Sequence, residues 1–542
     1  MLRTPFLPLN FLEQFNELTH AQLKDRLKII FDHPYLQEAI YIASPELHQE
    51  FQKWQQGYLI PDKEVDKLVL SLFKYLLRMC TRCTPYGLFA GCAVGEFDKT
   101  SQIILAPPGE YKKHCRLDMN YVAELAAMIC QLPEVKNQLC FYPNNSLYKI
   151  GNKYRYAEFT IKDKFRAYHL TEVACSPYLE KIIRTASQGV TLTALVNSIV
   201  SNAISEKEAT EFVIELVQNQ ILVSELEPTI TGEEFFIKLI KRMFTLENTT
   251  SITEKLSGIH QLLQDQTTGI DKYLQTHTLV KELLPDTNSK DLVQSDLILA
   301  TQHNTISSTV ITDIQRQIEK LWALARQNDN SDLKNFRQTF KERYEEQEIP
   351  LVIALDAEAG IGYAGYSGSN ADHIPLVDDI FTGKENESKT IAWSKMEDFQ
   401  LKRLHACLSN NAVEIELTDK DLDELKETTP PAIPDSLYLM GSILGESASA
   451  IDSGDYQFYL NGFGGPSAAT LLGRFCHGNE ALTAKVKECL QEEEQYNADA
   501  IYAEVVHLPE ARTGNVLLRP QLRDYEIVYL VMAVFLPITR FL

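Results

Sequence analysis

The sequence predicts an α+β protein made of several domains. Its 542 residues suffice for about three or four domains of ordinary size. Residues 62–80 carry apolar side chains at spacings of three and four, which predicts a buried amphipathic helix, whereas residues 139–170 are rich in Tyr, Phe and Ile, which is typical of strands. Helices and strands are thus both expected, and no βαβ alternation surrounds the glycine-rich stretch near residue 360.

The elements are expected in a definite order along the chain. The helix at 62–80 ends before the turn Pro85-Tyr86-Gly87, and strands follow within 88–107. A helix at about 119–131 precedes the strand-rich passage. Further along, the patterns predict helices through about residue 283, a strand at 290–300, a long helix at 306–327, a polar loop at 384–393 and a break at the acidic stretch 418–428.

The composition is that of an acidic globular protein. Charged residues make up 23% and hydrophobic residues 44%, which excludes a collagen-like or wholly disordered chain. The formal net charge is −22, so we do not expect the chain to coat nucleic acid or anionic membranes, because carboxylates repel phosphate. The ten cysteines are scattered, and no second CxxC or HxxxH accompanies Cys80 and Cys83, so neither a metal nor a redox site is favoured.

No targeting segment is recognisable. Residues 1–15 hold a short apolar stretch broken by two prolines, without a cleavage site for a signal peptide. The longest apolar run, 527–539, is shorter than the ~20 residues that cross a bilayer and contains a proline. We therefore expect a cytoplasmic protein.

Residues 186–226 have the sequence shape of a winged helix: helix, short link, helix and the strand ILVSEL. Such units commonly bind DNA, but Lys207 is the one basic residue here against five acidic ones. A helix that reads DNA normally carries Arg or Lys for the phosphates. A docking site for an extended peptide, or a purely structural role, therefore fits this segment better.

The stretch Gly360-Ile-Gly362-Tyr-Ala-Gly365 matches GxGxxG and follows an apolar stretch, 349–356, that is expected to be a strand. A dinucleotide site needs a helix to open at these glycines, because the helix N-terminus holds the pyrophosphate. The residues that follow lack helical periodicity. We therefore interpret the glycines as a hairpin or an active-site loop, and a nucleotide-dependent oxidoreductase remains a third hypothesis.

Arg78, Arg82 and Thr84 form the most informative cluster. The two arginines are four residues apart at the C-terminal end of the 62–80 helix, so their guanidinium groups share a face. Solvated arginines at a helix end are the alternative interpretation. Two arginines beside a hydroxyl suit a carboxylate or phosphate that must be held at two points. Residues 71–120 carry seven basic and four acidic side chains, a net charge of +3 within this acidic protein.

Four further residues are candidates. Asp118 stands just before the 119–131 helix, where an N-cap is the commonest role. Gln294 and Asp296 share one face of the strand expected at 290–300. Arg474 lies in an apolar segment, where a buried arginine needs a carboxylate partner.

At these residues the sequence resembles the N-terminal, glutamylating part of class I lantibiotic dehydratases. Arg78-Met-Cys-Thr-Arg82-Cys-Thr84-Pro-Tyr-Gly87 fits the family's RxxxRxTPxG form. Later blocks follow in the family's order, namely VQSDL (293–297), IPLVIALDAEAGIGY (349–363), GPSAATLLGRF (465–475) and EVVHLPEARTGNVLLRPQLRDYEI (504–527). The resemblance extends over essentially the whole chain to about Tyr529.

The resemblance implies an activity and its residues. Such enzymes transfer glutamate from glutamyl-tRNA, a co-substrate, to Ser or Thr of a ribosomally made precursor peptide, and a second domain then eliminates the glutamate to leave dehydroalanine or dehydrobutyrine. No other cofactor is implied. The implied partners are the precursor peptide with its leader, glutamyl-tRNA, a cyclase and transport complex at the membrane, and a second copy of the chain. By position, the glutamylation residues are Arg78, Arg82, Thr84, Asp118, Asp296 and Arg474.

The resemblance also implies a division of the chain. Residues 1–138 form a first glutamylation subdomain, 139–228 a winged-helix-like element that recognises the leader peptide, and 229–530 the remainder of the glutamylation domain. Family members continue far beyond residue 542, so two further arginines and the elimination domain are expected to be missing. We expect residues 531–542 to be a non-native tail caused by a frameshift, and the chain alone to be unable to dehydrate a peptide. A non-catalytic module that binds leader peptides is the alternative function.

Overall fold

The structure, a computed structural model, describes residues 1–58, 61–162, 165–287, 290–322, 331–363, 393–425 and 433–528. The chain divides into two compact units. The first comprises Met1–Glu96, Gln102–Thr305 and Ser467–Leu542, and the second comprises Phe97–Ser101 and Ile306–Pro466. The predicted boundaries at 138 and 228 fall inside the first unit, and the three-part division stays a prediction. The tail at 531–542 and nearly all of the polar loop at 384–393 lie outside the described residues.

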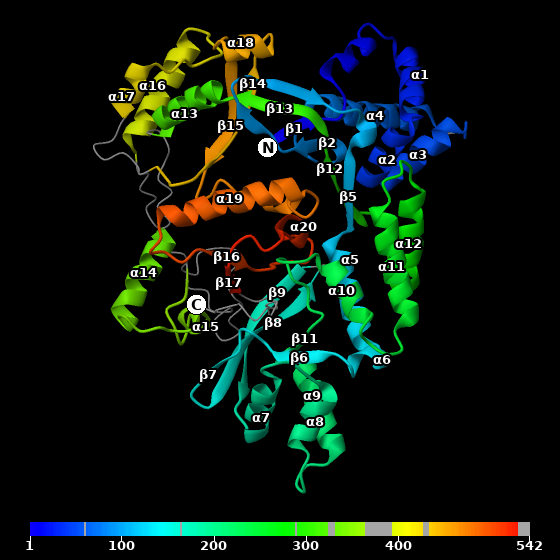
Figure 1. The fold of residues 1–542 in the computed structure, drawn as a ribbon, viewed down its shortest axis with the longest axis vertical. Coiled ribbons are helices and arrows are strands. Elements are labelled where there is room, and N and C mark those ends of the chain that lie inside the picture. The colour runs from blue at the N-terminus through cyan, green and yellow to red at the C-terminus, as the bar shows by residue number, and fades with distance from the viewer. Residues whose placement is uncertain are drawn as a thin grey trace. The chain divides into compact units, whose positions relative to one another are not determined.

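The first unit contains a mixed four-stranded sheet, called the central sheet below (Figure 1). Its strands, in spatial order, are β1 (Leu2–Pro5), β2 (Gly87–Ala93), β12 (Val293–Ile298) and β5 (Lys112–Leu117). Strand β12 runs parallel to β2 and antiparallel to β5. The central strand therefore comes from a part of the sequence far from its neighbours, as α+β folds allow.

Four helices pack beside β2: α1 (His20–Phe31), α2 (Pro34–Ala43), α3 (Pro45–Gln55) and α4 (Asp62–Thr81). The helix predicted at 62–80 is confirmed as α4. Its expected apolar face is buried throughout: Val65, Leu68, Val69, Leu72, Leu76 and Met79. These side chains share one hydrophobic cluster with Leu88 and Phe89 of β2. The packing therefore fixes the position of the end of α4 relative to the start of β2.

A second hydrophobic cluster joins α5 (Met119–Gln131), α10 (Phe235–Met243), α11 (Thr250–Gln264) and α12 (Asp271–Leu283) to the elements of residues 139–228. The helix predicted at 119–131 is confirmed as α5. The elements of residues 133–228 are α6 (Pro133–Lys136), β6 (Cys140–Pro143), β7 (Tyr148–Ile150), β8 (Lys153–Lys162), β9 (Phe165–Ala174), α7 (Pro177–Ala186), β10 (Val190–Thr191), α8 (Leu192–Ile199), α9 (Glu206–Gln218) and β11 (Leu222–Ser224).

Residues 139–228 form two small sheets, with strand orders β10-β6-β11 and β7-β8-β9. The helix, link, helix and strand expected over 186–226 correspond to α8, α9 and β11. The assignment of this unit as a winged helix stays a prediction. Within the part of the chain that the structure describes, β9 is an edge strand, because it pairs with β8 on one side alone.

Replacing Ser205 with alanine should weaken the start of α9. The Ser205 hydroxyl accepts the backbone N–H of Glu208 at 3.3 Å, and the Glu208 side chain accepts the backbone N–H of Ser205 at 2.9 Å. We expect Ser205→Ala to lower the free energy of unfolding by about 1 kcal/mol in urea denaturation followed by circular dichroism. The control Lys207→Ala, on the same helix, should change it by less than about 0.5 kcal/mol. Equal losses would contradict the prediction.

In the second unit, one helix packs against a pair of antiparallel strands. Helix α13 (Ser308–Trp322) buries Val310, Ile314 and Ile318 in one cluster with side chains of β14 (Tyr438–Leu444), α18 (Ala448–Asp452) and β15 (Gln457–Gly464). The helix predicted at 306–327 is confirmed over the bounds of α13. The other helices of this unit are α14 (Ser331–Tyr344), α15 (Leu351–Ala354), α16 (Lys395–Ser409) and α17 (Asp419–Leu425).

The strand expected at 349–356 is wrong, because the structure has the short helix α15 there. Pro350 stands just before the helix, and the Asp356 carboxylate accepts the backbone N–H groups of Glu358 and Ala359 at 2.7 and 2.9 Å, which closes a turn. The glycines from Gly360 therefore follow a helix, not the strand that a dinucleotide site requires. Ala364 and Gly365, the end of the motif, lie outside the described residues.

The remaining elements complete both units: η1 (Leu9–Phe15), β3 (Glu96–Asp98), β4 (Gln102–Leu105), η2 (Pro108–Glu110), β13 (Thr301–Ser307), η3 (Gly473–Phe475), α19 (Glu480–Tyr496), β16 (Ala503–Val506), α20 (Gly514–Leu517) and β17 (Tyr525–Val528). The strand expected at 290–300 is confirmed as β12. In the described parts of the chain, no helix is both long and apolar enough to cross a membrane.

Candidate functional site

One face of the central sheet carries polar side chains in a buried position. Strand pairing sets Asp296 of β12 opposite His114 of β5, and Gln294 opposite Arg116. Alternate residues of a strand point to the same face, so these four side chains share one side of the sheet. The opposite face of the same strands holds Cys115 and other members of the hydrophobic clusters. The sequence thus folds into a sheet with one polar face turned inward.

Asp296 and Arg474 form an ion pair on this face. Arg474 Nη2 donates to Asp296 Oδ1 at 2.7 Å, and the side chain of Asp296 is 5% exposed. Arg474 belongs to η3, and its guanidinium lies 4.8 Å from the ring centroid of Phe475. Gly478 permits the close approach of this segment, because a Cβ there would lie 2.8 Å from the Cβ of His114. The carboxylate partner that the sequence analysis required for Arg474 is therefore Asp296.

Asp118 lies at the end of the same face and caps α5, as expected. Its carboxylate accepts the backbone N–H of Asn120 at 2.9 Å and side-chain amides of Gln294 and Asn515 at 2.8 Å each. Burial raises the pKa of Asp118, although these hydrogen bonds oppose the shift. Gln294, which bonds Asp118, stands two residues before Asp296 on β12 and lies on the same face of the sheet.

Arg116 is a further residue of this face, one that the sequence indicates only as part of the basic segment 71–120. Its side chain is buried, the charges of Asp296, Glu234 and Asp118 act on it, and its Nη2 donates to the backbone carbonyl of Asn515 at 2.7 Å. Burial lowers the pKa of Arg116, while the charges of Asp296 and Glu234 raise it. Nothing in the sequence marks it, because it is one of several basic residues within 71–120.

His114, which lies opposite Asp296 in the register of the sheet, makes a close contact with Glu234. His114 Nε2 lies 2.8 Å from Glu234 Oε1, and both side chains are almost fully buried. Burial is the largest single influence on Glu234 and would raise its pKa, but the bond to His114 and the charges of His114, His477 and Arg116 together lower it. Neither residue is recognisable as a site residue in the sequence, because the two are 120 positions apart and no local spacing relates them.

The RxxxRxTPxG segment reaches the polar face from α4. Arg78 lies in the last turn of α4 with its guanidinium 4.7 Å from the ring centroid of Tyr86, whereas Arg82 and Thr84 are exposed. Gly87 begins β2 with φ +53°, a conformation that glycine adopts readily, and pairs in register with Asp296. The segment therefore ends beside the strand that carries Asp296.

The six predicted residues are only partly brought into contact. Asp296 bonds Arg474 directly, and Asp118 bonds Gln294, which lies two residues before Asp296 on the same face of β12. Among the described residues, no hydrogen bond or ion pair links Arg78, Arg82 or Thr84 to the other three. The side chains of Arg82 and Thr84 have no hydrogen-bond partner within the described parts of the chain, which leaves them available to a ligand.

The CxxC pair consists of two free thiols. Cys80 is buried in α4, and burial raises its pKa to about 11. Cys83 is exposed. A thiol with so high a pKa stays protonated near neutral pH and is a poor metal ligand. Within the ranges that the structure describes, no group of three or more His, Cys, Asp or Glu side chains is arranged to hold a metal ion.

A cavity of about 220 Å³ lies within residues 127–227. Aromatic rings of β6, β8 and β9 line it, from Phe141, Phe159 and Tyr168. The ion pair between Arg166 and Glu227, 2.7 Å long, also lines it, and the Arg166 guanidinium lies 4.1 Å from the ring centroid of Phe159. The lining combines apolar rings with one paired cation and anion, which suits a peptide side chain.

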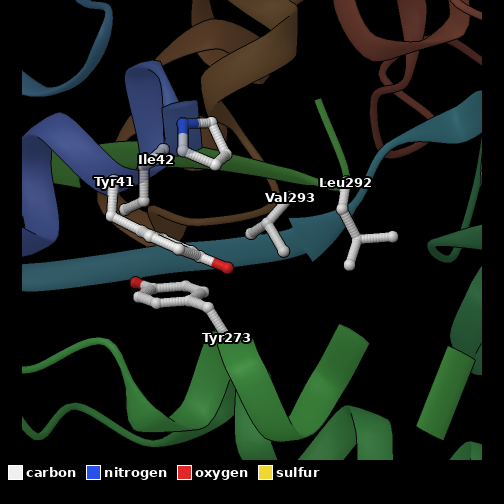
Figure 2. A pocket seen from close by; sticks show the side chains of 6 residues that line it. Tyr41, Ile42, Tyr273, Leu292 and Val293 are labelled. Atoms are coloured by element: carbon white, nitrogen blue, oxygen red, sulfur yellow. The ribbon is translucent and has the colours of Figure 1, made fainter. Parts of the chain in front are cut away.

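A smaller hollow lies on the other face of the central sheet (Figure 2). The rings of Tyr41 and Tyr273 stack there, 6.0 Å between centroids, beside Leu292 and Val293. Its volume is about 10 Å³, which at most accommodates a single water molecule. This hollow is therefore a packing defect in the core and not a ligand site.

Comparison with known proteins relates the chain to one family. A family model described as "Lantibiotic dehydratase, N terminus" matches residues 32–533. The epidermin biosynthesis protein EpiB of Staphylococcus epidermidis is 25% identical over 68% of this chain and 38% of the relative. The nisin biosynthesis protein NisB of Lactococcus lactis subsp. lactis is 22% identical over 95% of this chain and 50% of the relative. The chain thus spans half or less of the length of these two relatives.

Solved structures share the fold. The tRNA-dependent lantibiotic dehydratase MibB of Microbispora sp. 107891 matches with a TM-score of 0.75 at 19% identity, over 94% of this chain and 50% of that one. The glutamylation domain of TbtB, from thiomuracin biosynthesis, matches with a TM-score of 0.55 at 14% identity, over 89% of this chain and 58% of that one. The mixed α+β fold with several sheets is therefore that of these enzymes.

Proposed function

The chain belongs to the lantibiotic dehydratase family through the N-terminal part that the family model covers, and on this basis we propose that it transfers glutamate from glutamyl-tRNA to Ser and Thr side chains of a ribosomally made precursor peptide. Glutamylation is then the first step of dehydration to dehydroalanine or dehydrobutyrine. The observation that carries the proposal is the polar sheet face, which holds the Asp296–Arg474 pair and Asp118 and where Asp296 pairs in register with Gly87, the end of the RxxxRxTPxG segment.

The residues of this face suit the chemistry of the transfer. The Ser or Thr hydroxyl oxygen forms a bond to the carbonyl carbon of the glutamyl ester, the bond from that carbon to the tRNA ribose oxygen breaks, and the hydroxyl proton passes to the ribose oxygen. Arg78 and Arg82 provide guanidinium donors for the anionic end of the tRNA. Asp118 or Asp296 provides a carboxylate for the α-ammonium group of the aminoacyl ester or for the attacking hydroxyl.

Transfer is tested directly with trial acceptors. The purified chain is incubated with glutamyl-tRNA and the precursor peptides of epidermin and nisin, the products named for two relatives. Mass spectrometry should find a peptide heavier by one glutamyl group when charged tRNA is present, and no gain with uncharged tRNA. Peptide binding without any transfer would instead favour the non-catalytic module.

We also assign the leader of the precursor peptide to residues 139–228. The edge strand β9 offers unpaired backbone groups to an extended peptide, and the 220 Å³ cavity beside it accepts a side chain. Residues 139–228 contain none of the six predicted glutamylation residues. Binding of the leader and transfer of glutamate are therefore expected to be separable by mutation.

Phe159→Ala is expected to weaken binding of the leader peptide about 10-fold or more, because aromatic anchors in pockets carry much of the binding energy. Fluorescence anisotropy of a labelled leader peptide measures the affinity. The matched control is Phe244→Ala, which removes an exposed phenylalanine that is 68% accessible and distant in sequence from the cavity lining. Equal affinities of the two variants would contradict the assignment of the cavity.

A further inference from the structure

Arg116 holds hydrogen-bond donors that the protein itself does not use. The residue is 6% exposed, and its Nε and Nη1 are buried without a partner, while Nη2 alone is bonded, to the carbonyl of Asn515. Nε of Arg474, on the same polar face, is likewise buried and unpartnered. Buried donors are almost always satisfied in folded proteins, so these groups call for an acceptor that is absent from the chain.

The neighbouring carboxylates already have donors of their own. Asp296 is bonded by Arg474 and Asp118 by Asn120, Gln294 and Asn515, while the Glu234 carboxylate lies 2.8 Å from His114 Nε2. Their charges act on Arg116, but none of them bonds it. The missing acceptor is therefore best supplied by a bound ligand, and two neighbouring guanidinium groups favour an anion.

The position of Arg116 restricts which anion reaches it. Because the guanidinium is buried, a phosphate of the tRNA backbone, which is attached to ribose on both sides, is too bulky, and the exposed Arg82 is better placed for it. In glutamyl-tRNA the α-carboxyl group is esterified, so the side-chain γ-carboxylate is the one free carboxylate of the aminoacyl group. It stands at the end of a narrow chain of two methylene groups, which suits a buried partner.

Resting on the proposed function, we infer that Arg116, together with Arg474, binds the γ-carboxylate of the glutamyl group and selects glutamate over glutamine. A glutaminyl group has the same shape but presents a neutral amide. It would leave the buried guanidinium groups without a counter-ion and would turn amide N–H donors toward other donors. Sites that bond a substrate group in this manner reject analogues that lack it. Arg116 is thus a specificity residue of the site.

The test uses two stable probes on the full chain. They are 3′-amino-3′-deoxyadenosine carrying glutamate or glutamine through an amide, which replaces the labile ester. Isothermal titration calorimetry should find that the unaltered protein binds the glutamyl probe about 100-fold more tightly than the glutaminyl probe. In Arg116→Gln the ratio should fall to about 3-fold or less, while the affinity for the glutaminyl probe changes by less than about 3-fold. A purely structural role would weaken both probes alike.

Two variants keep the test decisive. Arg242 is matched to Arg116, because it is partly buried, pairs with Glu225 at 2.8 Å and also has an unpartnered Nε, but it lies outside the polar face. Arg242→Gln should keep the ratio of the unaltered protein. Arg116→Lys retains the charge without the planar donor fork and should lower the ratio about 10-fold, which provides the readout should Arg116→Gln fail to fold.

The outcomes separate this inference from the proposed function. Equal binding of the two probes by the unaltered protein, or an undiminished ratio in both Arg116 variants, overturns the role of Arg116 and leaves glutamyl transfer standing. Binding of neither probe by the unaltered protein overturns the proposed function and the inference with it. A ratio that falls in the Arg116 variants and not in Arg242→Gln establishes the selection of the γ-carboxylate.

Discussion

Arg82→Ala is expected to abolish glutamyl transfer, with a rate at least about 100-fold below that of the unaltered protein, as is typical when an electrostatic contact to the reacting group is removed. The side chain of Arg82 is exposed at the end of α4 and has no partner among the described residues, so the fold does not depend on it. Mass spectrometry of the acceptor peptide, sampled over time with glutamyl-tRNA present, measures the rate.

The matched control for this prediction is Arg26→Ala, which removes an exposed arginine from α1 and should leave the transfer rate unchanged. Circular dichroism should be the same for both variants. Transfer by Arg82→Ala at the rate of the control would overturn the role of the RxxxRxTPxG segment. Binding of the leader peptide should survive in both variants, because the cavity and edge strand of residues 139–228 do not contain Arg82.

Glu38→Ala is expected to cause the largest loss of stability, about 3–5 kcal/mol in the free energy of unfolding. Glu38 of α2 is fully buried, and its carboxylate lies 2.8 Å from Lys113 Nζ and 3.4 Å from Lys272 Nζ. It also accepts the hydroxyl of Tyr273 at 2.8 Å. Removal of this carboxylate leaves two buried ammonium groups without a counter-ion, which is why the loss exceeds that of a surface ion pair.

Urea denaturation measures this loss, and Glu46→Ala, an exposed carboxylate on α3, is the control that should change the stability by less than about 0.5 kcal/mol. Lys113 neighbours His114 and precedes Arg116 on β5, so the network supports the strand that carries the polar face. We therefore expect the variant to lose probe binding at a lower urea concentration. A loss below about 1 kcal/mol would show that the two lysines are neutral or solvated in the folded protein.

Much of the local structure was predictable from the sequence. The apolar spacing of residues 62–80 predicts α4, and each residue of the expected face is buried. Asp118 caps α5 as expected, because an aspartate just before a helical pattern satisfies free backbone N–H groups. The strand expected at 349–356 was wrong, because an apolar run of this length is compatible with either element and Pro350 favours a helix start.

The candidate site was only partly predictable. The motif spacing identified Arg78, Arg82 and Thr84 as a group, and the roles of all six residues stay predictions, of which Arg82→Ala tests one. The contact between Asp296 and Arg474 joins residues 178 positions apart, which no periodicity in the sequence relates. Arg116 was overlooked for the same reason: one more basic residue in a basic segment carries no signal until the strands around it are paired.

By itself, the sequence determined the elements and the chemistry available to them, because helix and strand periodicity and capping depend on neighbouring residues. Only the tertiary structure decided which groups meet. The register of β12 between β2 and β5 sets Asp296 against Gly87 and His114, and a shift by one residue would turn Asp296 to the opposite face. The buried, unpaired donors of Arg116 exist in that register alone, since burial depends on the whole sheet and what covers it.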